Sequence, residues 1–327
     1  MIKKYLINKI SVTTMCILLL AMFYLIPTSN IQPQIDKENL NAKEKVVYLL
    51  DNDSYISKVK YFFDDKTLEE EIKNRLEILK NGLETIDIFY PLIPVNTKMN
   101  SIKVEKNSVY IDFSKEILNV DEYLEESMIE AIVYTLSEIN GIEKIYIKVE
   151  GKELKQLPNS RKNIPYPLTR SIGINKNYNL DNLKDIEKTT VVFSKKQDNI
   201  QYYVPITMIN NNSDDKIKII IEELKSSIHS QNELNGLIND KLILEEYTIE
   251  DKTMRLVFNE YIFENIEQNF ISEEVKNVIS ESIFENYDIN EIVLDTKNQK
   301  NITKIKETPW KYKKNIVYFY LSVEMTP

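Results

Sequence analysis

The chain has 327 residues, of which 43% are apolar and 10% aromatic, and its formal net charge is −9; this length suffices for roughly two domains with apolar cores. Acidic and basic residues are interleaved, so the chain lacks the dense Lys/Arg patch that phosphate-backbone binding needs, and nucleic acid is a poor candidate partner. Five well-separated glycines leave no room for a phosphate-binding loop, and a lone His229 and a lone Cys16 exclude His/Cys metal clusters and Cys–His nucleophilic pairs. We therefore expect no cofactor and no bound metal.

The N-terminal segment predicts a membrane anchor. It has three lysines within its first nine residues and then an apolar run over residues 10–26, which Pro27 ends. A basic start before an apolar run keeps the start cytoplasmic and exports the rest. The run is short for crossing a bilayer and also fits a signal peptide cleaved after Ser29, but we favour an uncleaved anchor, with residues 1–43 as cytoplasmic start, membrane segment and spacer. Cys16 precedes most of the run, so it does not fit a lipidation site.

Residues 67–82 predict the first helix of the exported part. Thr67 and Glu70 fit a capping box, in which each side chain binds the backbone N–H of the other residue. The apolar residues recur at helical spacing and form one stripe. They are Leu68, Ile72, Leu76 and Leu79.

Three further segments complete this unit. The stretch "SIKVEKNSVYIDF" (101–113) alternates on both sides of a tight turn, as a β-hairpin does. Residues 122–139 have an apolar helical face, and Gly141 suits the C-terminal cap of that helix. The stretch "EKIYIKVEG" (143–151) predicts a closing strand.

The same patterns recur in the second half of the chain. A shift of 145 positions aligns the halves without a gap from residue 46 to residue 118, and the shift then becomes 147. "VVYLL" (46–50) falls on "VVFSK" (191–195), and "AIVYTLSEINGIEKIYIKV" (131–149) falls on "VISESIFENYDINEIVLDT" (278–296). Such a steady shift, with apolar residues on apolar residues, indicates a duplication.

Each copy is predicted to run β–β–α–β–β–α–β. Two amphipathic helices and a small sheet, each with one apolar face, pack as two layers. The predicted fold class is therefore α+β: two tandem two-layer domains, each with two helices on a small mixed sheet, behind an N-terminal transmembrane anchor. The predicted boundaries are residues 44–155 for the first domain, 156–188 for a proline-containing linker, 189–304 for the second domain and 305–327 for a C-terminal strand tail.

The stretch "NSVYIDFSKEIL" (107–118) holds a candidate catalytic pair, Asp112 and Glu116. At the shift of 145 its apolar residues recur, but its polar residues do not. Asp112, Ser114, Lys115 and Glu116 meet Val257, Asn259, Glu260 and Tyr261. Acid–base catalysis also needs carboxylates with shifted pKa values in a cleft, whereas this pair lies where a strand meets a loop. We predict no catalytic, cofactor-binding or metal-binding residues.

The linker and the tail hold the remaining candidates. Arg170 is either an anion-binding residue or a residue that pins the linker to a domain surface, and we favour the second interpretation. His229 is read as a surface residue. Residues 308–325 alternate apolar and polar, which predicts a strand that adds to the second sheet or to a neighbouring subunit. Trp310 and the nearby tyrosines are expected to pack on that strand rather than stack on sugars.

The exported part resembles the GerM sporulation/germination family, which carries two tandem GerMN domains. "SVYIDFSKEIL" (108–118) is similar to the family's hairpin end, and "IVYTLSEINGIEKIYIKVEGKEL" (132–154) is similar to its helix–strand segment. "YPLTRSIGIN" (166–175) looks like the segment after the first domain. The resemblance covers residues 45–304, and the second copy is more divergent because it lacks the Asp-Phe-Ser core of "IDFSKE".

This resemblance implies a non-enzymatic assembly role. Proteins of the family sit at the outer forespore membrane of endospore-forming bacteria, have domains similar to the ring-building motif of secretion-system rings, and support the channel complex joining mother cell and forespore. The resemblance also implies protein partners from that channel complex and a location facing the intermembrane space. Family members are often lipoproteins, whereas this chain has no usable lipobox, so its contact with the membrane is expected through the N-terminal helix.

Three classes of function are compatible with the sequence. The leading one is an exported scaffold. The second is a cell-wall glycan-binding or sensing module, which requires exposed tyrosines gathered in one place. The third is a wall hydrolase, which requires a buried carboxylate pair about 5–10 Å apart. Duplicated domains also form rings by head-to-tail contact, so a homo-oligomer is an open alternative.

Overall fold

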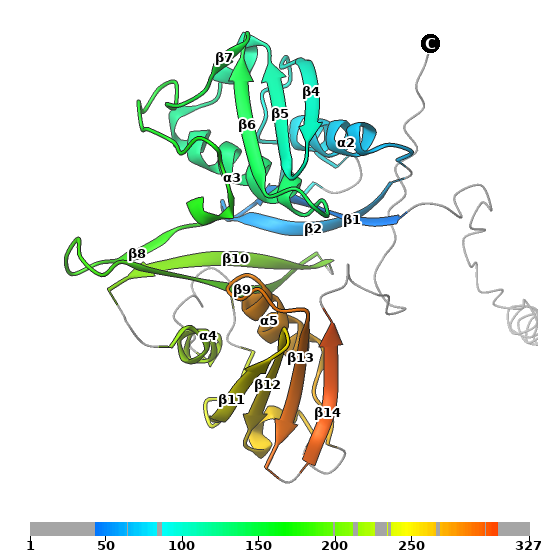
Figure 1. Ribbon diagram of the computed structural model, residues 1–327, viewed down its shortest axis with the longest axis vertical. Coiled ribbons are helices and arrows are strands. Elements are labelled where there is room, and N and C mark those ends of the chain that lie inside the picture. Colours follow the sequence, from blue (N-terminus) through cyan, green and yellow to red (C-terminus); the bar gives the residue numbers. More distant parts are fainter. Residues whose placement is uncertain are drawn as a thin grey trace, which may run out of the picture. The chain divides into compact units, whose positions relative to one another are not determined.

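A computed structural model describes residues 43–306 except 64, 84–86, 199, 212–214, 226–233, 235–236, 266–268 and 298 (Figure 1). Within these ranges no helix is long and apolar enough to cross a membrane. Several sequence predictions fall outside the described residues and stay predictions. They concern the anchor at residues 10–26, Cys16, His229, Trp310 and the strand at 308–325.

The first repeat follows the predicted order, with two short strands added. Its elements are β1 (Lys43–Asp51), β2 (Ile56–Phe63), α2 (Leu68–Asn81), β3 (Phe89–Tyr90), β4 (Met99–Glu105), β5 (Ser108–Phe113), α3 (Glu125–Ser137), β6 (Lys144–Val149) and β7 (Lys152–Glu153). Two 3-10 turns, η2 (Lys115–Leu118) and η3 (Glu122–Leu124), stand between β5 and α3.

The helix ends of the first repeat test two predictions. The capping box of α2 is confirmed, since the Thr67 hydroxyl accepts from the Glu70 N–H and the Glu70 carboxylate accepts from the Thr67 N–H. The prediction that Gly141 caps the next helix is wrong. Helix α3 is capped by Glu138, because the chain leaves it through two tight turns, and Gly141 takes its positive φ of 86° in the second of them.

The second repeat has the same order of elements, except that its described residues contain no counterpart of β3. They are β9 (Glu187–Gln197), β10 (Ile200–Asn210), α4 (Lys216–Lys225), β11 (Leu244–Glu250), β12 (Thr253–Phe258), α5 (Glu273–Phe284), β13 (Glu291–Thr296) and β14 (Gln299–Lys306), with the 3-10 turn η6 (Glu260–Ile262) before α5. The linker contains η4 (Arg170–Ile172) and β8 (Asn177–Asn179). Strand β14 was not predicted, and it carries the second repeat two residues past the predicted boundary at 304.

The described strands form three sheets. One has the order β4-β5-β6-β7 and another the order β11-β12-β13-β14. In each, the central pair is parallel, because a helix crosses between its two strands. The third sheet contains the β1–β2 hairpin and the β9–β10 hairpin, one from each repeat, together with β3 and β8.

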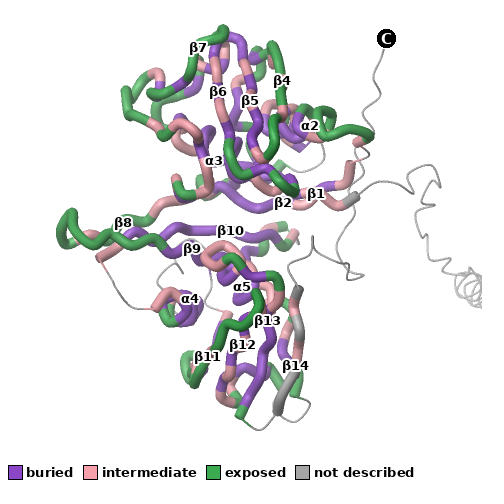
Figure 2. The backbone as a smooth tube through the Cα atoms, in the orientation of Figure 1, coloured by how far each residue is buried: buried purple, intermediate pink, exposed green. Residues whose placement is uncertain are grey.

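The predicted two-layer domain with a single sheet is therefore wrong. In the first repeat, α2 contacts both β1 and β4, and α3 contacts both β1 and β6, so the helices lie between two sheets (Figure 1). Strands β2, β9 and β10 are buried over continuous runs of residues, and β10 is buried along most of its length (Figure 2). Such runs are typical of strands covered on both faces, whereas alternation is typical of strands with one face in water.

In the structure, strands β1 and β9 correspond at a separation that is one residue smaller than the 145 of the gapless sequence alignment. The hydroxyl of Thr135 on α3 accepts from the Tyr48 N–H at 2.9 Å, and the hydroxyl of Ser282 on α5 accepts from the Val192 N–H at 2.8 Å. Thr135 and Ser282 are equivalent in sequence, so Tyr48 corresponds to Val192, at a separation of 144. The second hairpin is also longer, since Tyr48 pairs with Lys58, ten positions further on, whereas Val192 pairs with Pro205, thirteen positions further on.

We expect the variant Thr67→Ala to lower the free energy of unfolding by about 1 kcal/mol, because it removes the hydroxyl that caps α2. Urea unfolding monitored by circular dichroism measures this loss. Lys66→Ala is the matched control, since it changes an exposed neighbouring side chain and leaves both capping bonds in place. An equal loss in the two variants would contradict the assignment of the cap.

Candidate functional site

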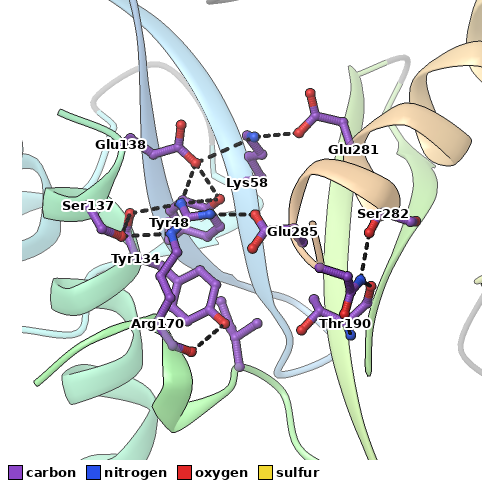
Figure 3. A network of polar contacts seen from close by, with 12 residues as sticks. Tyr48, Lys58, Tyr134, Ser137, Glu138, Arg170, Thr190, Glu281, Ser282 and Glu285 are labelled. Carbon is purple, nitrogen blue, oxygen red and sulfur yellow. Dashed lines mark hydrogen bonds and ion pairs between the residues drawn. The ribbon is translucent and has the colours of Figure 1, made fainter. Parts of the chain in front are cut away.

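Arg170 of the linker binds both repeats. Its Nη2 lies 2.6 Å from Oε1 of Glu138, and its Nη1 lies 2.5 Å from Oε1 of Glu285 (Figure 3). Its Nε donates to the Ser137 hydroxyl at 2.7 Å, and its guanidinium lies 4.7 Å from the ring centre of Tyr134. The interpretation of Arg170 as a residue that pins the linker is confirmed, and the anions that it binds are two glutamates of this chain.

The two glutamates occupy equivalent positions in the duplication. Glu138 is the C-terminal cap of α3 and Glu285 is the C-terminal cap of α5. A helix C-terminus carries partial negative charge, so a carboxylate there is unfavourable unless a cation neutralises it. Arg170 supplies that cation for both helices. The role of the two glutamates was not predicted from the sequence, although the same acidic residue stands at the same place in both copies.

Lys58 of β2 provides a second link between the repeats. Its Nζ lies 2.7 Å from Oε2 of Glu281 on α5 and 3.4 Å from Oε1 of Glu138. Lys58 is also the β2 residue that pairs with β10, opposite Tyr203. Backbone pairing and side-chain ion pairs therefore join the repeats at the same place. We call Tyr48, Lys58, Glu138, Arg170, Glu281 and Glu285 the inter-repeat latch.

The charges within the inter-repeat latch shift one another's pKa values. Burial by itself would raise the pKa of Glu138, but the positive charges of Lys58 and Arg170 outweigh it, together with a hydrogen bond donated by the Tyr48 hydroxyl at 2.7 Å. The pKa of Glu138 is therefore held well below its ordinary value. Burial would lower the pKa of Lys58, but Glu138 and Glu281 raise it well above its usual range. Glu138 and Lys58 therefore both stay charged at neutral pH.

A second buried cluster also joins the repeats. Lys195 of β9 forms ion pairs with Asp51 of β1, at 3.1 Å, and with Asp53. Burial would lower the pKa of Lys195, but the hydrogen bonds to Asp53 and Asp51 outweigh it and raise that pKa. Asp51 also accepts hydrogen bonds from the hydroxyls of Ser57 and Tyr202. A buried charge needs this degree of pairing, so the cluster requires both repeats to be in place.

The candidate pair Asp112 and Glu116 has separate structural partners. Asp112 accepts a hydrogen bond from the Gly151 N–H at 2.8 Å and so holds the turn after β6. A hydrogen bond from Ser114 lowers the pKa of Glu116. Nothing in these contacts directs the two carboxylates at a common point. In the described part of the chain, no three His, Cys, Asp or Glu side chains are grouped as metal ligands would be.

Comparison with known proteins connects this architecture to one family. The family model for Germane, described as sporulation and spore germination, matches residues 46–155. The spore germination protein GerM of Bacillus subtilis (strain 168) is 29% identical over 247 residues, which cover 71% of this chain and 66% of that protein. Residues 46–155 thus match a Germane domain, and most of the chain is similar to GerM. The match to GerM spans slightly less than two thirds of the length of that relative.

One solved structure extends the comparison to the fold. The tandem GerMN domains of GerM from Bacillus subtilis match with a TM-score of 0.73 at 24% identity, over 82% of this chain and 98% of that one. At this identity the likeness establishes the fold alone, namely tandem GerMN-like α+β domains with mixed sheets. The first GerMN domain of the same protein matches 39% of this chain and 98% of its own, with a TM-score of 0.35 at 25% identity.

We expect the stability difference between the wild type and Glu138→Gln to shrink as the pH falls below about 4.3, the ordinary pKa of glutamate in an unfolded chain. The folded-state pKa of Glu138 is depressed, so its contribution is complete above the unfolded-state pKa. That contribution is lost as the pH falls towards the folded-state value. Urea unfolding between pH 3 and pH 7 measures both variants.

Glu122→Gln, at an exposed residue of η3, is the control for this titration. If the difference for Glu138→Gln stayed constant on acidification, the charge of Glu138 would not be part of the latch.

Proposed function

We propose that this chain is a non-enzymatic, membrane-anchored sporulation protein that assembles with, or supports, the channel complex between mother cell and forespore. The match of residues 46–155 to the Germane domain carries this proposal, together with the similarity to a relative whose name is that of a spore germination protein. The proposal includes a role in efficient spore formation and germination.

The inter-repeat latch supports a scaffold role. Its carboxylates are engaged with cations of this chain, and two of those ion pairs cross from the first repeat or the linker to the second repeat. A protein that presents two domains to partners benefits from a fixed angle between them, and buried ion pairs with strict geometry specify one arrangement over others. The latch therefore supports the use of the two repeats as one rigid unit for binding partners.

The proposed location follows from the sequence of the N-terminus. The basic start and the apolar run at residues 10–26 support an anchor with its start in the mother-cell cytoplasm. Residues 44–306 are then placed in the space between the outer and inner forespore membranes. In that space the two repeats are accessible to channel proteins of both cells.

A crosslinking pull-down from sporulating cells tests the proposal. Tagged full-length protein is crosslinked while the forespore is being engulfed, and we expect the recovered material to contain proteins of the forespore channel complex. An unrelated single-pass membrane protein with the same tag and expression level is the control. Recovery of wall fragments without channel proteins, or of channel proteins with both baits equally, would refute the scaffold role.

A further inference from the structure

Three tyrosines gather on the outward face of the β4–β7 sheet. Tyr110 and Tyr146 are register partners on the parallel strands β5 and β6, and their rings stack with centres 4.4 Å apart and planes 10° apart. Tyr166 of the linker meets the Tyr146 ring edge-on at 5.1 Å. We call these three residues the tyrosine platform.

The platform lies on the side of the sheet that faces away from the helices. Along β5 and β6 the alternate residues are buried, whereas Tyr110 and Tyr146 are only partly buried. Helix α3 contacts β6 and helix α2 contacts β4, so the buried residues form the core beneath the helices. The tyrosines therefore do not belong to that core.

The second repeat shows that the fold does not require the platform. Strands β12 and β13 form the same parallel pair, and the residues in register at the equivalent place are Arg255 and Val293. The aromatic stack is thus a feature of the first repeat alone. A feature present in only one of two copies with the same fold is better explained by what it binds than by what it stabilises.

Lysines flank the platform on the same face. Lys103 of β4 lies opposite Tyr110 and is paired with Glu105 at 2.5 Å. Lys144 and Lys148 stand two residues before and after Tyr146 on β6, and Lys148 lies opposite Glu153 of β7. This face therefore combines partly exposed aromatic surface with two lysines, of which Lys144 stands beside Ser108 and Lys148 stands between Asp112 and Glu153.

We propose that the tyrosine platform binds a carboxylate-bearing glycan, which is the chemistry of cell-wall glycan strands. The apolar CH face of a pyranose ring packs on the face of Tyr110 that is turned away from Tyr146, and the tyrosine hydroxyls exchange hydrogen bonds with sugar hydroxyls. Lys144 and Lys148 pair with the carboxylates. This function goes beyond scaffold assembly, and it depends on the proposed exported location only for access to the wall.

A pelleting assay tests the platform independently of the scaffold role. Full-length protein in mild detergent is mixed with purified peptidoglycan sacculi stripped of other wall polymers, or with chitin as an uncharged glycan. We expect binding to sacculi that is stronger than binding to chitin. The variant Tyr110→Thr/Tyr146→Val lowers the affinity for sacculi by about tenfold or more, equivalent to about 1.4 kcal/mol.

Two further variants complete the design. Tyr123→Thr removes a tyrosine that is 78% exposed and outside the platform, so it keeps wild-type binding. Lys144→Gln/Lys148→Gln reduces binding to sacculi to the level seen with chitin. Threonine and valine are strand formers, and circular dichroism checks that the tyrosine variant is folded.

The proposal is overturned if the wild type does not pellet with sacculi, or if the folded tyrosine variant pellets as well as the wild type. Should the tyrosine variant fail to fold, the lysine variant decides, and unchanged binding to sacculi overturns the proposal. Neither outcome bears on the recovery of channel proteins, so the two proposals succeed or fail separately.

Discussion

One guanidinium group bound to two equivalent glutamates fixes the relation between the repeats. Arg170 places one terminal nitrogen on Glu138 and the other on Glu285, which are the C-terminal caps of corresponding helices. The planar fork of arginine suits this task because its donors have a fixed geometry, whereas a lysine ammonium is a point charge. The linker between the repeats thus supplies the residue that holds both together.

The other contacts between the repeats depend on the same arrangement. Lys58 reaches Glu281 only while β2 lies beside β10, and the buried Lys195 finds its partners, Asp51 and Asp53, in the other repeat. Buried ion pairs contribute little net stability when compared with apolar packing, but separating the partners leaves uncompensated charges and costs several kcal/mol. The charged contacts therefore add little to the net stability of the fold. Their main effect is to disfavour other arrangements of the two repeats.

The sequence predicted the local structure well and the long-range structure poorly. Helix α2 and its capping box were predicted because their signals lie within a few residues of one another. The joining of the β1–β2 and β9–β10 hairpins in one sheet was not predicted, because strand pairing between repeats leaves no periodic signal. Only one residue of the inter-repeat latch was predicted to have a structural role. Arg170 was expected to pin the linker, but its partners lie 32 and 115 positions away.

The duplication also served as an internal control. Asp112 and Glu116 lacked counterparts in the second copy, and both have local structural partners in the first. The same comparison separates the latch from the tyrosine platform. Glu138 and Glu285 are shared because each repeat must be tied to the linker, whereas Tyr110 and Tyr146 occur once because no fold requirement demands them.

The most direct test of this account is a double-mutant cycle on Arg170→Ala and Glu285→Ala, with free energies of unfolding from urea denaturation of the full-length protein. The account predicts a coupling energy of about 1 kcal/mol or more between these residues. Arg161, an exposed arginine of the same linker, is the control partner, and its coupling to Glu285 is expected to stay within about 0.5 kcal/mol of zero. Additive effects for Arg170 and Glu285 would contradict the claim that this contact fixes the two repeats.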